Sequence, residues 1–182
     1  TYDDFLELVR DKIEFQLSLI RTTDKLALFF TAMNVMVDTK TVLEGRDFDI
    51  DQPRRCTLKD MRGNERTVTF APGKNIMFLR LSNVFALFDR SSYNNEGATL
   101  STIEQNLRSH PSFIGKVSSH KFTWEETVEV PKNDDDGTMI KVRKKRSSPT
   151  SAVVIDYDVF MEMYDLDLRR DNDTIPDTHA SA

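Results

Sequence analysis

The stretch that decides the fold is Asn75 to Asp89, NIMFLRLSNVFALFD. Ten of the thirteen residues from Ile76 to Phe88 are apolar, so the rest of the chain has to cover most of this surface. A helix of this length spans about 20 Å, and a bilayer span needs roughly 20 apolar residues. We therefore predict a buried central helix, and we expect no membrane contact.

Three polar residues, Arg80, Ser82 and Asn83, interrupt this apolar stretch. A helix that is apolar on nearly every side offers few places where such groups can reach water. We predict that Arg80 and Asn83 are polar residues of the core. An unpaired buried guanidinium is too costly, so we expect Arg80 to pair with a carboxylate.

Apolar residues recur at three- and four-residue steps on both sides of the central stretch. The period runs from Leu6 to Ile20 and from Leu26 to Val37, which predicts an antiparallel pair of helices. Shorter helical patterns begin at Leu100 and at Tyr157. The fold class expected is mainly α with some β, a helical bundle around a central apolar helix. We expect one such domain over residues 1–170, with a flexible tail over residues 171–182.

Two β-hairpins are predicted as insertions in this bundle, at about residues 56–71 and 124–146. In the first, we expect Cys56 to oppose Phe70 across a turn at Arg62-Gly63-Asn64. In the second, two alternating segments flank Pro131 to Gly137, PKNDDDG, a sequence typical of a turn.

The register of the second hairpin bears on function. Opposing Val128 with Val142 places one apolar row on the core, and the same register opposes Glu129 with Lys141. The hairpin also carries a basic cluster, which is a candidate binding surface: Lys141, Arg143, Lys144, Lys145 and Arg146. Because acidic residues lie across the ladder, we favour a charge-paired hairpin over a phosphate-binding patch.

Composition and motifs narrow the function classes. The net charge of −5 gives no general attraction to nucleic acid or anionic membranes. Cys56 is the only cysteine, which excludes an internal disulfide and a cysteine-cluster metal site and favours a cytoplasmic protein. No glycine-rich phosphate loop, nucleophile elbow or zinc-protease motif is present, and no two of the three histidines share metal-ligand spacing. We expect neither a metal nor a cofactor.

Two segments carry a resemblance to a known family. They are LRLSNVFALFDRSS, at residues 79–92, and TLSTIEQNL, at residues 99–107. Preceded by the predicted helical pair, they resemble the abortive-infection U-type branch of the HEPN superfamily. That resemblance implies a helical bundle, often dimeric, and in many members a metal-independent ribonuclease of antiphage defence or toxin–antitoxin systems.

The active motif of that family is an arginine followed after a short interval by a histidine. The closest match here is Arg170 with His179, with eight residues between them. The resemblance implies that Arg170 binds the scissile phosphate of an RNA substrate and that His179 assists attack by the ribose 2′-hydroxyl.

Two functions from different classes remain open at this point. The first is a helical interaction module, an accessory or defence-system component that binds a protein partner or forms a homodimer. The alternative is the ribonuclease that the family resemblance implies, so the sequence leaves open whether this protein is an enzyme.

Overall fold

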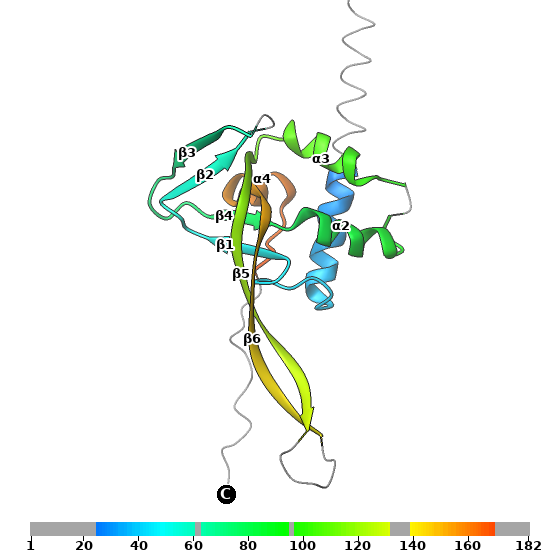
Figure 1. Cartoon of the computed structure of the whole chain (residues 1–182). Helices are drawn as coiled ribbons and strands as arrows, with labels where there is room; N and C mark the ends of the chain where they lie inside the picture. The colour runs from blue at the N-terminus through cyan, green and yellow to red at the C-terminus, as the bar shows by residue number, and fades with distance from the viewer. Residues whose placement is uncertain (1–24, 61–62, 95–96, 132–138, 170–182) are drawn as a thin grey trace, which may run out of the picture.

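A six-stranded antiparallel sheet forms the centre of the molecule, in the order β1-β4-β6-β5-β2-β3 (Figure 1). The computed structural model describes residues 25–60, 63–94, 97–131 and 139–169. The strands are β1 (Phe48–Asp51), β2 (Arg55–Lys59), β3 (Glu65–Thr69), β4 (Ile76–Leu79), β5 (Phe113–Pro131) and β6 (Met139–Asp156). The helices are α2 (Leu81–Arg90), α3 (Leu100–Arg108), α4 (Tyr157–Tyr164) and one over residues 25–38. The predicted helical bundle is therefore wrong, since the described fold is mainly β.

The predicted central helix is a strand followed by a helix. Ile76 to Leu79 form β4, in which all four residues are buried, and α2 begins only after Arg80. A continuous apolar run is typical of a strand that is covered on both faces of its sheet. Such a run cannot be distinguished from a helical segment by periodicity alone, which explains the error.

β4 contributes to two hydrophobic clusters, one on each face of the sheet. Met77 and Leu79 belong to the helix-side cluster, which includes Phe29, Phe88 and Phe160 from three helices. The hairpin-side cluster lies on the other face and consists of Cys56, Leu58, Ile76, Phe78, Val117, Phe122, Ala152 and Val154. The helices therefore cover one face, and β2 contributes to covering the other (Figure 1).

Both predicted hairpins form, but as parts of the sheet and not as insertions in a bundle. β2 pairs with β3 in a register two residues from the predicted one, so that Cys56 opposes Val68 and not Phe70. A shift of two residues keeps each side chain on its predicted face. β5 pairs with β6 in the predicted register, with Val128 opposite Val142 and Glu129 opposite Lys141.

The helices outside the sheet match the sequence patterns in part. The second predicted helix is present over residues 25–38, whereas its predicted partner from Leu6 to Ile20 and the predicted tail at 171–182 lie outside the described residues. Over the ranges that the structure describes, no helix is both long enough and apolar enough to cross a bilayer.

Candidate functional site

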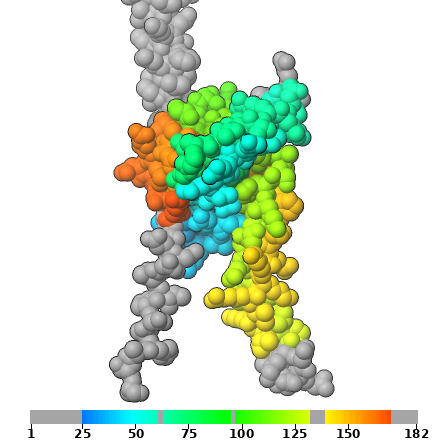
Figure 2. All heavy atoms as spheres, turned by 90° about the vertical axis from the view of Figure 1, so that its left-hand side faces the viewer, coloured from blue at the N-terminus to red at the C-terminus, as the bar shows by residue number. Residues whose placement is uncertain are grey.

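The outer half of the β5–β6 hairpin projects from the body of the protein as a two-stranded arm (Figures 1 and 2). We define the arm as residues 124–131 and 139–146. Within the described ranges, β6 pairs with β4 only over residues 153–156 and β5 pairs with β2 only at Lys116. No other described strand therefore pairs with the arm, and its outer edges present backbone groups that can accept a further strand.

The outer part of one face of the arm is apolar. Opposed residues of an antiparallel pair lie on the same face, so one face carries Val128, Val130, Ile140 and Val142, which we call the valine face. Ile140 is 41% exposed, and none of the four residues is part of either described hydrophobic cluster. The prediction that this row packs on the core is wrong, because the arm extends past the sheet.

The basic cluster lies along one strand of the arm, and all five of its residues are exposed: Lys141, Arg143, Lys144, Lys145 and Arg146. Acidic residues lie opposite on β5. Arg146 Nε is 2.9 Å from Glu126 Oε2, and Lys141 Nζ is 4.0 Å from Glu129 Oε1. Such exposed pairs stabilise the hairpin by only about 0–1 kcal/mol each. The acidic partners nevertheless offset much of the positive electrostatic potential that the basic cluster would need in order to bind a phosphate backbone.

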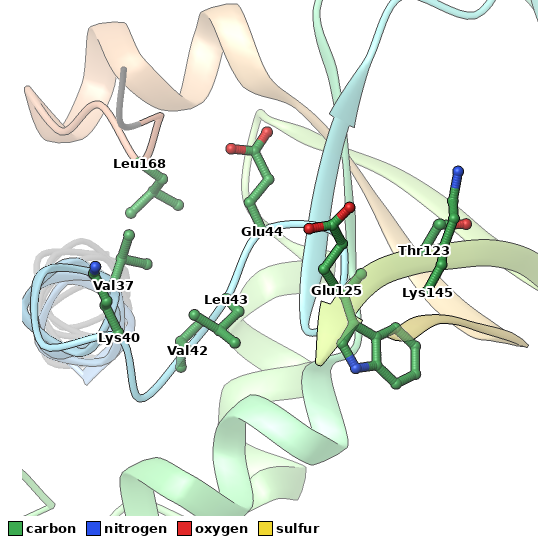
Figure 3. A pocket seen from close by; sticks show the side chains of 10 residues that line it. Val37, Lys40, Val42, Leu43, Glu44, Thr123, Glu125, Lys145 and Leu168 are labelled. Carbon is green, nitrogen blue, oxygen red and sulfur yellow. The ribbon is translucent and has the colours of Figure 1, made fainter. Parts of the chain in front are cut away.

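A pocket of about 620 Å³ lies at the base of the arm (Figure 3). Four segments far apart in the sequence line it: Val37, Lys40, Val42, Leu43, Glu44, Thr123, Trp124, Glu125, Lys145 and Leu168. Leu43 and Trp124 are half-buried and supply apolar surface, while Lys40, Glu44, Glu125 and Lys145 are exposed. Val42 and Leu168 are fully buried beneath that surface. The pocket can therefore contact both an apolar body and a charged group.

Glu44 is the pocket residue whose ionisation is perturbed. Desolvation by the surrounding protein raises the pKa of its carboxyl, and the negative charges of Asp49 and Asp167 raise it further, against the lowering effect of Arg169. The residue is still exposed, so solvent screens part of this effect. A perturbed carboxyl in a concave site is a candidate functional group.

Replacing Glu44 with Gln is expected to stabilise the protein slightly at neutral pH. Because the folded-state pKa lies above the unfolded one, the protonated form favours folding, and Glu44 opposes folding once the pH exceeds its folded pKa. We expect a gain of about 0.5 kcal/mol at about pH 7 that disappears at about pH 4. Thermal denaturation at both pH values measures it, with Glu129→Gln in the arm as control. An equal gain in stability at both pH values would show that the ionisation of Glu44 is not its cause.

Beside this pocket residue, Asp49 makes an unpredicted contact with His120. His120 Nε2 lies 2.9 Å from Asp49 Oδ2, and the ring stacks on Phe78 with centroids 3.9 Å apart. No local pattern in the sequence reveals a contact between residues 71 positions apart. This contact links β1 to β5 across the hairpin-side face.

The polar residues of the central stretch lie elsewhere than predicted. Asn83 is exposed and so is not a core residue. Arg80 is half-buried, donates from Nη1 to the backbone carbonyl of Arg46 at 2.9 Å, and lies 5.6 Å from the centroid of the Phe122 ring. The partner found for its guanidinium is therefore a carbonyl, where we predicted a carboxylate.

The ribonuclease hypothesis is not tested by this geometry. Arg170 and His179 both lie outside the described residues. Within the ranges that are described, no group of three or more histidine, cysteine or acidic side chains is arranged to hold a metal ion.

Comparison of the chain with protein-family models, with curated proteins and with solved structures finds no match in any of the three.

Proposed function

We propose that this protein is an interaction module that self-associates through the valine face of its arm. The observation that supports this proposal most directly is an apolar row, with Ile140 exposed and the three valines half-buried, on a ribbon with which no other described strand pairs. A two-stranded hairpin is at best marginally stable by itself in water. Packing against a second layer would remove the valine face from water and stabilise the arm.

The charges of the arm favour a second copy in one orientation. Every described charge on its β5 half is acidic, and every described charge on its β6 half is basic. A two-fold axis parallel to the strands places β5 of one copy over β6 of the other, so that opposite charges meet. A two-fold axis in the plane but across the strands would superpose like charges. Two arms that project in the same direction are therefore the favoured arrangement.

The size of the valine face sets the expected affinity. Four β-branched side chains in each copy cover far less than the roughly 800 Å² per partner of a standard interface. We therefore expect a weak dimer, with a Kd on the order of 100 µM. Sedimentation velocity from about 10 µM to about 1 mM covers this range, and a monomer at every concentration would contradict the proposal.

The substitution Val128→Asp is expected to abolish self-association. It would bury a carboxylate in the interface, which costs several kcal/mol without a partner. Its matched control is Thr127→Asp, which introduces the same residue at the adjacent position on the opposite, exposed face. Sedimentation should show a monomer for the first variant and a normal dimer for the second. Equal behaviour of the two variants would rule out the valine face as the interface.

Complementary charge variants test the orientation. Glu126→Lys and Lys144→Glu each place like charges across the parallel interface, so each alone should weaken association. In a mixture, one copy supplies two lysines and the other two glutamates, so both cross-copy pairs are restored. Mixing should therefore recover the dimer, and a failure to recover it would exclude this orientation.

A further inference from the structure

We propose that the pocket at the base of the arm binds an organic cation, an ammonium or guanidinium group carried on a short apolar stem. This inference is independent of self-association through the valine face. It combines the volume of the pocket, its apolar walls and the position of Glu44 among other acidic residues.

The pocket has the dimensions and lining of a small-ligand site. Its volume of about 620 Å³ lies within the range of about 300–1,000 Å³ that ligand pockets occupy. The apolar stem would contact the half-buried side chain of Leu43, and Trp124, also half-buried, adds an aromatic ring. Aromatic rings also attract cations through the negative charge of their faces.

The charges around Glu44 favour a cation over an anion. Asp49 and Asp167 both act on Glu44 with negative charge. Among the described residues the one cation found to offset them is Arg169, whose Nη2 already donates to Asn75 Oδ1 at 2.6 Å and whose guanidinium lies over the Tyr157 ring. A bound cation would relieve this repulsion, and its affinity would rise with pH as Glu44 ionises.

The other charged residues of the pocket do not alter this preference. Glu125 and Lys145 are directly opposed across the β5–β6 ladder, so their charges offset each other. In the view of Figure 3, Glu44 and Glu125 lie between Lys40 and Lys145. Lys40 also lines the pocket, but it is not among the groups that shift the ionisation of Glu44.

The chain carries its own reporter for this site, because Trp124 is its only tryptophan. We expect n-butylguanidinium to change the Trp124 fluorescence with a Kd on the order of 1 mM. N-butylurea, which has the same shape without the charge, should bind at least about tenfold more weakly. Butyrate, with the opposite charge, should not bind. Equal binding of the urea, tighter binding of butyrate, or no response to any probe would overturn the proposal.

Two variants test whether Glu44 is the residue that binds the cation. Glu44→Gln should weaken n-butylguanidinium binding about five- to tenfold, because it removes the charge and keeps the shape. Glu126→Gln is the matched control, since this glutamate lies on the opposite face of the arm from Glu125 and does not line the pocket. An unchanged affinity in Glu44→Gln, or an equal loss in both variants, would overturn the assignment.

Peptide probes distinguish two possible ligands, a basic side chain of a polypeptide and a free organic cation. The probes are acetyl-Gly-Arg-Gly-amide and the same peptide with citrulline, which is neutral, in place of arginine. If the arginine peptide binds at least about tenfold more tightly than n-butylguanidinium, the ligand is a basic side chain of a polypeptide. If the two bind equally, it is a free organic cation. A citrulline peptide that binds as tightly as the arginine peptide would contradict the proposal.

Discussion

Gly45→Ala is expected to lower the free energy of unfolding by about 3–5 kcal/mol, a large part of the stability of a domain of this size. Gly45 has a φ of +79°, in the left-handed region that other residues occupy only at a cost. A Cβ atom at this position would also collide with the backbone carbonyl oxygen of Thr123. Because this oxygen belongs to β5, it cannot rotate away as a side chain would.

Gly73→Ala is the control that separates the two causes. Gly73 has the same φ of +79°, but a Cβ atom there meets nothing within 4 Å. It should therefore show only the conformational cost, about 1 kcal/mol. Urea denaturation followed by circular dichroism measures both variants. Equal losses would show that the close approach of the Gly45 loop to the base of the arm contributes nothing.

Tyr157→Phe is expected to cost about 1–3 kcal/mol, through a single hydroxyl group. The Tyr157 side chain is fully buried, and its Oη donates to Asp167 Oδ1 and accepts from the backbone N–H of Leu168, both at 2.6 Å. Phenylalanine keeps the ring but leaves the N–H of the buried Leu168 without this acceptor. Because Leu168 forms a wall of the pocket, the same hydroxyl also fixes part of the site.

Tyr164→Phe provides the matched comparison for this effect. The Tyr164 hydroxyl is also buried, yet it has no hydrogen-bond partner among the described residues, and burial raises its pKa to about 12. Removing it should change the stability by less than about 0.5 kcal/mol, or increase it. Thermal denaturation of both variants tests this difference. A loss for Tyr164→Phe as large as for Tyr157→Phe would show that the hydroxyl contacts do not explain the effect.

The arm shows which parts of the fold can be predicted from sequence. Its two strands are neighbours in the chain, they alternate over residues 127–130 and 139–143, and their charges are complementary. Local reasoning therefore gave the pairing of Val128 with Val142 and of Glu129 with Lys141. The same reasoning could not show that the arm leaves the sheet. That depends on where β4 and β2 stop pairing with the hairpin, which is a property of distant segments.

The central stretch shows why the architecture was wrong. Ile76 to Leu79 are apolar because β4 is buried between two layers. Four residues of α2 are apolar because they pack on one of those layers: Leu81, Val84, Phe85 and Phe88. Joined end to end, the two patterns are typical of one long buried helix. Deciding between a strand and a helix required the partners of β4, namely β1 and β6. No pattern within the stretch identifies them.

The pocket could not be predicted, because no short motif contains it. Glu44 and Trp124 belong to segments about eighty positions apart, and Leu168 comes from a third segment. The repulsion of Glu44 by Asp49 and Asp167 likewise exists only in the folded chain. The sequence could only have indicated that the single tryptophan lies near the start of an alternating strand.

Because β4 is buried on both sides, it joins the two hydrophobic clusters into one cooperative unit. Ile76 and Phe78 belong to the hairpin-side cluster, while Met77 and Leu79 belong to the helix-side cluster. If either layer separated from β4, the apolar β4 residues on that face would be exposed to water. The loss of their packing would also weaken the support that β4 gives to the other layer. We therefore expect the helices and the β2–β3 hairpin to unfold in one transition, although they lie on opposite faces of the sheet.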